Sequence, residues 1–217
     1  YGRSVVKHLV GQLVDRGLAI TSGMALGIDG IAHAACLARG GATIAVLGTG
    51  PDQVYPPQHA SLYAEIQQQG LIVSEFPPGT TAAPSHFPQR NRVVTGLSLG
   101  TLVVEARLKS GSLISARLAM EQGREVFAVP GSVLSKLSEG CHQLLRDGAK
   151  LTADEQDVLE ELAIESMISV EQTRSKRNDA LTLLQTQLLN VLDLEPQAQD
   201  RLAELIGVPI NEVIRTL

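Results

Sequence analysis

Two arginines beside a phenylalanine are the feature of the sequence that most specifically suggests a binding site. They lie in the run Phe87-Pro88-Gln89-Arg90-Asn91-Arg92, where Pro88 suits the first turn of a helix. Residues two apart do not share a regular helix face, so in an irregular first turn Arg90 and Arg92 are expected to diverge around an anion. Phe87 adds a ring on which a nucleic-acid base stacks. The alternative for either arginine is an ion pair with a structural carboxylate.

Two turns rich in glycine and serine are candidate anion cradles. Ser110-Gly111-Ser112 follows Lys109 and opens a helix expected at Leu113–Gln122, and Ser22-Gly23 leads to Gly27. Such turns let backbone N–H groups face a ligand oxygen, and the helix start adds positive partial charge. Neither turn matches a P-loop or a dinucleotide fingerprint. The alternative is that these glycines only let the helices pack on the sheet.

Carboxylates at strand ends are the candidates for acid or base catalysis. Asp29, Glu75 and Glu105 occupy such places, but no nucleophile–base pair accompanies them. Glu75 and Glu105 are also the natural partners for the two arginines, and Asp29 is expected to act as a cap or an arginine partner. His33 lies on an apolar helix and is read as a packed histidine. The sequence therefore predicts no catalytic residue.

Charge is unevenly distributed along the 217 residues. The chain carries a net charge of −5, which by itself argues against nucleic acid. Between residues 86 and 124, however, six basic residues face only two carboxylates, whereas residues 153–171 contain carboxylates and no Lys or Arg. A basic region next to an acidic one predicts a charge-segregated surface.

Composition limits the compartment and the cofactors. The two cysteines, Cys36 and Cys141, are far apart and have no Cys or His at ligand spacing, which predicts neither a disulfide framework nor a metal site. No apolar run reaches membrane-spanning length and no secretion leader is visible, so a cytoplasmic protein without cofactor is expected. The helical pattern begins almost at Tyr1, as in a fragment whose preceding segment is missing.

Strand and helix patterns alternate through the first 150 residues. Short apolar runs predict buried strands, and longer amphipathic stretches between them predict helices. Strand–helix alternation indicates an α/β fold with a Rossmann-like, doubly wound, mostly parallel sheet, whose ligands bind beyond the carboxyl ends of the strands. The strands are expected at Leu18–Thr21, Ala42–Leu47, Leu71–Ser74, Thr101–Val104 and Glu125–Val129, and the helices at Ile28–Ala38, Gln58–Gln69, Gln89–Leu97, Leu113–Gln122 and Cys141–Arg146.

The rest of the chain is expected to form a linker and a small helical domain. The predicted division is a Rossmann-like domain at 1–150, an acidic helix and linker at 151–179, and a C-terminal domain at 180–217. Helices are expected at Leu183–Leu192, Ala198–Gly207 and Asn211–Leu217. This last part has a negative net charge, which disfavours contact with the phosphate backbone. It is therefore interpreted as a protein-docking or regulatory domain in preference to a DNA-binding one.

An ordered series of motifs resembles the DprA/Smf family of DNA-processing proteins over about residues 1–150. The resemblance is carried by the series and by no single piece. The matching pieces are Tyr1-Gly2, Ser22-Gly23-Met24-Ala25-Leu26-Gly27-Ile28-Asp29, Thr43–Gly48, Tyr55-Pro56, Ser74-Glu75, Phe87–Arg92, Gly96–Ser98, Val103–Ala106, Ser110–Ala116, Gly123–Gly131 and Gly140.

The resemblance implies a Rossmann-like domain that binds single-stranded DNA, forms a homodimer and hands the strand to the RecA recombinase during natural transformation, without known catalytic activity. It also implies that residues 180–217 are a truncated winged-helix-like domain. The implied DNA-binding residues are Phe87, Arg90, Arg92, Lys109, Ser110, Gly111 and Ser112, with Ser22, Gly23 and Gly27 opposite.

This sequence departs from the family pattern in two places. The family has a first strand ending in a Gly-x-Arg turn just before the Tyr-Gly, and that arginine is expected to contact DNA; here the turn is absent. Ser115 stands where Thr is common, which keeps the hydroxyl.

Two other functions stay open at this stage. One is a nucleotide hydrolase of the phosphoribohydrolase type, in which a glycine-rich Gly-Gly-x-Gly-Thr turn is followed by a Glu. Here strand residues separate Gly100-Thr101 from Glu105, and the preceding glycines are missing. The other is a protein-interaction module with a vestigial pocket.

Overall fold

The computed structural model describes residues 1–163 and 199–216, which fall into two compact units, Tyr1–Leu162 and Ala163–Leu217. The first unit contains six strands: β1 (Ile20–Ser22), β2 (Thr43–Leu47), β3 (Leu71–Ser74), β4 (Gly100–Val103), β5 (Glu125–Ala128) and β6 (Lys150–Leu151). Its α-helices are α1 (Gly2–Asp15), α2 (Ile28–Leu37), α3 (Ala60–Gln69), α4 (His86–Gly96), α5 (Gly111–Glu121), α6 (Glu139–Arg146) and α7 (Glu155–Glu161).

Every strand pair in the first unit is parallel, which confirms the predicted class. The strands form two groups of three, β1-β2-β3 and β4-β5-β6, which we call the two half-sheets. β1 and β4 are each paired on one side only. The five strands expected from the sequence are present within two residues of their predicted ends, whereas β6, with only two residues, carried no usable apolar pattern.

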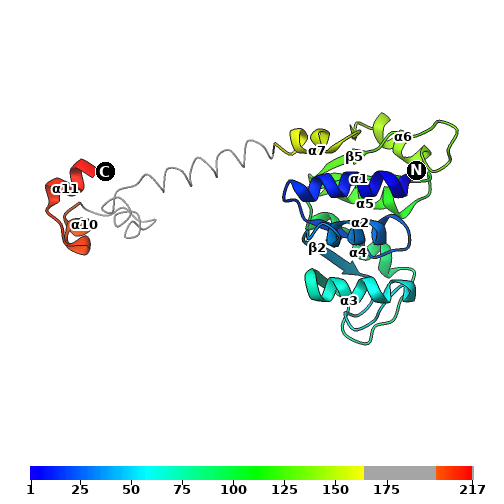
Figure 1. The fold of residues 1–217 in the computed structure, drawn as a ribbon, viewed down its shortest axis with the longest axis horizontal. Coiled ribbons are helices and arrows are strands. Elements are labelled where there is room, and N and C mark those ends of the chain that lie inside the picture. Colours follow the sequence, from blue (N-terminus) through cyan, green and yellow to red (C-terminus); the bar gives the residue numbers. More distant parts are fainter. Residues whose placement is uncertain (164–198, 217) are drawn as a thin grey trace. The chain divides into compact units, whose positions relative to one another are not determined.

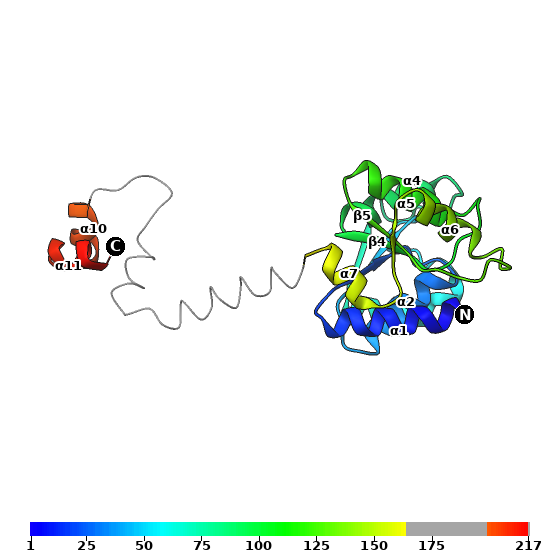
Figure 2. The same ribbon diagram turned by 90° about the horizontal axis from the view of Figure 1, so that it is seen from above.

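Helices cover both faces of the half-sheets, as a parallel sheet requires. α1 packs against α2 and α2 against α3, while α4 packs against α5. Figure 2 shows α1 and α2 on one side of β4 and β5, with α4 and α5 on the other side; Figure 1 looks onto the α1 and α2 layer. The first unit is therefore a three-layer α/β/α domain.

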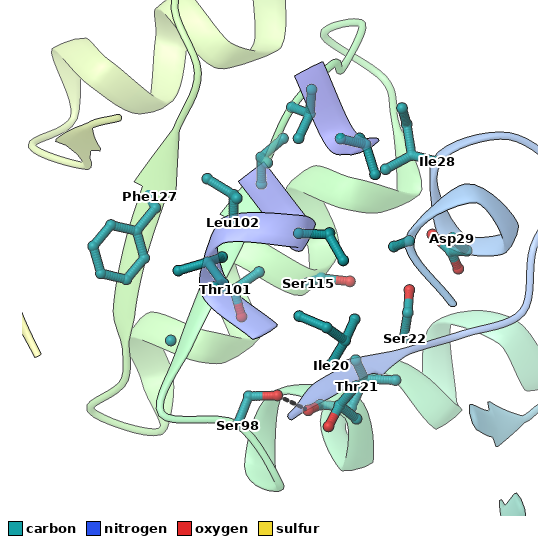
Figure 3. Close-up of a pocket in the computed structure, with 18 of the residues that line it drawn as sticks. Ile20, Thr21, Ser22, Ile28, Asp29, Ser98, Thr101, Leu102, Ser115 and Phe127 are labelled. Carbon is teal, nitrogen blue, oxygen red and sulfur yellow. Dashed lines mark hydrogen bonds between the residues drawn. The ribbon is translucent and has the colours of Figure 1, made fainter. Parts of the chain in front are cut away.

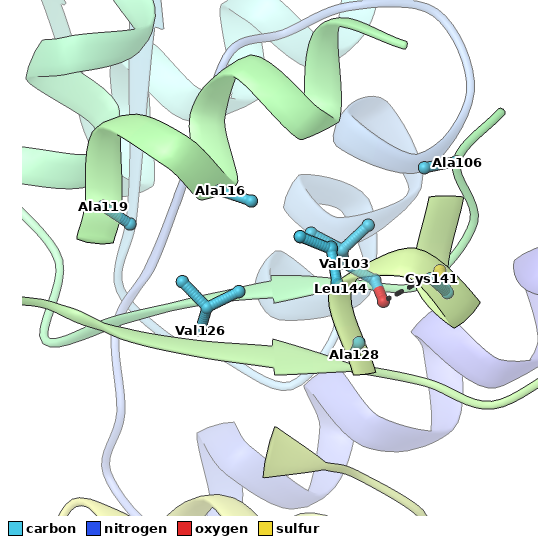
Figure 4. Packing of buried hydrophobic residues seen from close by; sticks show 8 residues of the cluster. All are labelled: Val103, Ala106, Ala116, Ala119, Val126, Ala128, Cys141 and Leu144. Carbon is cyan, nitrogen blue, oxygen red and sulfur yellow. Dashed lines mark hydrogen bonds between the residues drawn. The ribbon is translucent and has the colours of Figure 1, made fainter. Parts of the chain in front are cut away.

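Small residues bring α5 close to the second half-sheet. Ala116 and Ala119 are fully buried against Val103, Val126 and Ala128 (Figure 4). α6 closes this cluster with Cys141 and Leu144. Because aromatic residues make up only 3% of the chain, close approach of alanine and valine replaces large rings in filling this core.

The acidic helix belongs to the first unit. Asp154 caps α7 by accepting from the backbone N–H groups of Gln156 and Asp157, and Asp157 completes a capping box. Val158 and Leu159 on its inner face are buried, and α7 contacts α1. The first unit thus continues to Leu162, beyond the expected division at residue 150.

The second unit contains a short helical pair. α10 (Gln199–Ile206) and α11 (Ile210–Thr216) pack through Leu202, Ala203 and Val213. Gly207, at φ 70°, makes the turn between them. These helices match the expected ones at 198–207 and 211–217. The linker and the helix expected at Leu183–Leu192 lie outside the described residues.

Candidate nucleic-acid interface

Two hollows reach the carboxyl end of β1. One is a recess of about 240 Å³, which we call the aromatic recess. The other has a volume of about 380 Å³, lies between β1 and β4, and is called here the interstrand slot (Figure 3). Gly23, at the end of β1, lines both. The aromatic recess is lined by Gly23, Met24, Ala25, Leu26, Gly48, Thr49, Tyr55, Pro56 and Phe87.

Two rings form one wall of the aromatic recess. Phe87, in the first turn of α4, lies with its ring centroid 5.3 Å from that of Tyr55, and the planes are tilted by 32°. Gly48 faces Phe87 so closely that a Cβ there would stand 2.9 Å from the ring. Any other residue at position 48 would displace the ring. Tyr55 is 43% exposed, so the pair offers an accessible aromatic surface.

Histidines hold the loops around this recess through backbone carbonyls. His86 Nδ1 lies 3.1 Å from the Gly48 carbonyl oxygen, and His59 Nδ1 lies 2.9 Å from that of Met24. Since a carbonyl oxygen only accepts, each Nδ1 carries the hydrogen. His86 also stacks on Phe76 at 4.2 Å between ring centroids. The recess is therefore braced from two loops.

Arg90 lies behind the recess and not at its mouth. Its side chain is buried, with only 4% of the residue exposed, and its Nη1 donates to the carbonyl oxygens of Gly23 (2.6 Å) and Val46. Gly23 has no Cβ because one would stand 2.5 Å from the guanidinium. Burial lowers the pKa of Arg90, and the charge of Asp29 opposes that shift. Arg90 joins β1, β2 and α4 at the carboxyl edge.

Arg92 is exposed and paired with Glu75 at the end of β3. The sequence predicts that the two guanidinium groups diverge around one anion. This prediction is wrong, because one group is buried and the other is exposed and paired. The reason is that α4 is already helical at His86, so residues 90 and 92 point in different directions. Arg92 forms the ion pair with a structural carboxylate that was the alternative prediction. Arg90 donates to backbone carbonyl oxygens instead of a carboxylate.

The Ser110-Gly111-Ser112 turn opens α5 as predicted. Ser110 is its N-cap, and its Oγ accepts from the Ser112 backbone N–H at 3.2 Å. Gly111 and Lys109 are exposed beside it, and α5 lies against α4. Arg92 lies on α4 and Lys109 in the turn before α5, and neither lines the two hollows.

The loop after β1 is organised by Asp29. Its Oδ2 accepts from the backbone N–H groups of Gly23 (3.1 Å) and Ala25 (3.2 Å). Gly27, at φ 95°, is the N-cap residue of α2. Ser22 and Gly23 reach the interstrand slot together with Ser112, so these three predicted residues meet there, whereas Gly27 does not line it.

His33 is a packed histidine, as its apolar neighbours predicted. It is fully buried, and its Nδ1 donates to Thr43 Oγ1 at 2.7 Å because that hydroxyl donates in turn to the Ile20 carbonyl. Its Nε2 is buried without a partner among the described residues. Burial lowers the pKa of His33 to about 4. The ring is therefore neutral at physiological pH.

Glu105 occupies a structural position. Its Oε1 accepts from the Gly2 backbone N–H at 3.2 Å, at the positive end of α1. A Cβ on Gly2 would stand 2.3 Å from the other carboxylate oxygen. The carboxylate that follows Gly100-Thr101 is thus engaged in capping a helix.

Tyr55 is the recess residue that the sequence reasoning missed. Its place in the Tyr55-Pro56 motif, in a chain with three Tyr and three Phe, was the available signal. Its loop runs between β2 and α3, and only the tertiary structure brings it to α4.

Across the described ranges, 1–163 and 199–216, no helix has the length and apolarity to cross a bilayer.

A parallel α/β domain with its hollows at the carboxyl ends of the strands defines a Rossmann-like binding protein. The family model described as DNA recombination-mediator protein A matches residues 1–163, and the chain belongs to this family of DNA-processing proteins. Over 228 aligned residues that cover the whole chain, it is 42% identical to Protein Smf of Escherichia coli K12. Over 159 residues, 73% of the chain, it is 50% identical to the DNA processing protein DprA of Streptococcus pneumoniae.

Solved structures agree with the fold. DprA from Streptococcus pneumoniae superposes with a TM-score of 0.70 at 48% identity, covering 74% of this chain and 56% of that one. DprA from Helicobacter pylori, whose structure concerns its single-stranded DNA binding mode, gives 0.69 at 33% identity over 76% and 75% of the two chains. The chain spans about half the length of the curated relatives it matches.

Proposed function

We propose that this chain binds single-stranded DNA without sequence specificity at the carboxyl edge of its first unit. The aromatic recess carries the proposal. Phe87 and Tyr55 offer a ring surface beside glycine-walled loops, and a base of any kind stacks on such a surface. At about 240 Å³ the recess is smaller than a typical small-molecule site of roughly 300–1,000 Å³, which suits one flat base.

The phosphate chain is assigned to two cations, Arg92 on α4 and Lys109 in the turn before α5. Arg92 and Lys109 are both exposed, and the Ser110–Ser112 turn adds the start of a helix. Ser22, Gly23 and Gly27 form the opposite rim of the site. Arg90, because it is buried, is proposed to position Gly23 and the first turn of α4, and not to contact phosphate.

In a cell the DNA-bound form is proposed to act as a homodimer that passes the strand to the RecA recombinase in natural transformation or recombination, and to do so without catalysis. The similarity to the DNA-processing proteins of Streptococcus pneumoniae and Helicobacter pylori supports this role. Mass measurement in solution tests the dimer. Faster nucleation of RecA filaments on single strands in the presence of the chain tests the hand-over.

A titration of labelled oligonucleotide tests the binding itself. We expect a single strand to bind more tightly than the matching duplex, with affinity that falls steeply with salt. The double variant Arg92→Ala/Lys109→Ala should weaken binding about tenfold or more. The matched control is Arg39→Ala/Lys7→Ala, which removes the same charge; Arg39 is paired with Asp15 and as exposed as Arg92 (51% against 53%), but follows the far end of α2. Equal losses in both double variants would contradict the site.

A further inference from the structure

A second pair of stacked rings lies outside the aromatic recess. Phe76 follows the end of β3 by two residues, and His86 is the first residue of α4. Their ring centroids are 4.2 Å apart, and the ring planes are 23° from parallel. Both residues are half-buried, so the pair keeps an accessible surface, and neither ring lines the recess. We call Phe76 and His86 the outer ring pair, and Tyr55 and Phe87 the inner ring pair.

The two ring pairs are joined through Gly48, the residue that follows β2. Its carbonyl oxygen accepts from His86 Nδ1 at 3.1 Å, and a Cβ on it would stand 2.9 Å from the ring of Phe87. His86 and Phe87 are consecutive in the first turn of α4, where successive side chains point about 100° apart. A single helical turn therefore directs one ring to each pair.

Hydrogen bonds fix the backbone that carries Phe76. Its N–H donates to Ser74 Oγ at 3.0 Å, and that hydroxyl donates to the Thr49 carbonyl oxygen at 2.6 Å. Thr49 itself lines the recess. A ring held in this way loses little conformational freedom when a base stacks on it. The outer ring pair is thus preorganised and tied to the wall of the recess.

The charges beside the outer ring pair suit a neutral base with a phosphate next to it. Glu75, which directly precedes Phe76, is neutralised by its ion pair with Arg92. Arg92 is assigned to phosphate above, although it does not line the recess. Because it pairs with the residue next to Phe76, a phosphate that it holds belongs to a nucleotide at the outer ring pair.

We infer that the outer ring pair is a second base-binding subsite, so that one single strand stacks one base on the inner ring pair and another on the outer ring pair. The strand then crosses the carboxyl ends of β1, β2 and β3 in turn, which is their order in the first half-sheet. Stacking accepts every base, so the second subsite adds affinity without sequence preference. The subsite rests on the proposed function, since it extends the same strand beyond the recess.

Strands with one or two bases test the second subsite. The probes are fluorescein-labelled abasic deoxyribose-phosphate strands of equal length that carry no base, one thymine, or two thymines separated by zero to three abasic residues. One thymine should bind more tightly than none. Two thymines give a gain of about twofold merely because either can occupy a single subsite. At the spacing that reaches both ring pairs, we expect a further gain of about fivefold or more.

Variants that remove one ring and no charge assign this gain. Phe76→Leu keeps an apolar side chain against His86; it should abolish the further gain and lower single-thymine affinity by no more than about twofold, because the recess is intact. Phe87→Leu should abolish the same gain and weaken single-thymine binding more than Phe76→Leu does. Tyr1→Leu, which removes an exposed ring that belongs to neither pair, is the control and should keep the gain.

Photo-crosslinking on the unaltered chain gives the answer even if Phe76→Leu fails to fold. Each thymine of the two-thymine strand is replaced in turn by 5-iododeoxyuridine, which crosslinks to aromatic side chains that it stacks on, and tandem mass spectrometry locates the modified residue. We expect one position to crosslink to Tyr55 or Phe87 and the other to Phe76 or His86. Crosslinks from both positions to the inner ring pair alone would overturn the second subsite.

The same titrations separate a failure of the subsite from a failure of the proposed function. If one thymine strengthens binding and no spacing of two thymines gives more than the twofold gain, the second subsite is wrong and the recess stands. If one thymine binds no better than the abasic strand, stacking in the recess is wrong, and the second subsite is overturned with it.

Discussion

The aromatic recess and the interstrand slot meet at Gly23, yet their walls differ in kind. The recess has side-chain rings and backbone loops for walls. The exposed cations assigned to phosphate are Arg92 on α4 and Lys109 in the turn before α5. The slot has strand edges for walls and two carboxylates, Asp29 and Glu105, at its carboxyl end. Hollows that meet at one residue therefore differ in the chemistry of their walls, even where the topology is shared.

The largest expected effect on the free energy of unfolding comes from removing Arg90, which lies behind the aromatic recess. Arg90→Ala leaves the Gly23 and Val46 carbonyls without their charged donor and empties a buried volume, so we expect a loss of about 3–5 kcal/mol in the free energy of unfolding. Urea denaturation measures it. Arg39→Ala, an exposed arginine with an exposed partner, should cost less than about 1 kcal/mol. A small loss for Arg90→Ala would show that the recess does not depend on it.

Lowering the pH is expected to destabilise the fold through His33, which lies on α2 and contacts Thr43 of β2. The pKa of His33 is about 4 in the folded chain against 6.5 for a free histidine, so the unfolded chain binds more protons between these values. The free energy of unfolding should therefore fall as pH drops from about 6.5 to 4, by about 3 kcal/mol in all. In His33→Leu this part of the pH dependence should vanish, whereas in His8→Ala, at an exposed position on α1, it should persist.

A substitution at Phe87 tests the aromatic recess alone, because Phe87 does not line the slot. Phe87→Leu removes a stacking surface from the recess and leaves the slot lining intact, so single-strand affinity should fall by about 5- to 150-fold. The slope of affinity against salt should not change, because no charge is lost. Anisotropy titrations at several salt concentrations measure both quantities. A changed slope with unchanged affinity at low salt would contradict stacking.

The smallest effect concerns the rim carboxylate. Glu75→Gln releases Arg92 from its ion pair and removes a negative charge near the proposed phosphate path, so single-strand affinity should rise by about two- to fivefold. Asp15→Asn, which releases Arg39 in the same way, is the matched control and should leave the affinity unchanged. Weaker binding of Glu75→Gln would mean that the ion pair holds Arg92 in its binding position.

The strands and helices of the first unit followed from local patterns, because apolar periodicity reports which residues a sheet must bury. The same patterns correctly placed the Ser110–Ser112 turn at the start of a helix and His33 among packed residues. They did not predict β6, which is too short to show a period, nor the role of Arg90. A buried arginine that donates to carbonyls 67 and 44 residues away has no local signature.

By itself the sequence determined the α/β class, the turns at the strand ends and the family, since these depend on residue type and order along the chain. Only the tertiary structure decided which arginine is buried, that Tyr55 meets Phe87, and that β1 and β4 face each other across a slot. These depend on contacts between segments distant in the chain. Burial, not residue type, sets whether a guanidinium serves the fold or a ligand.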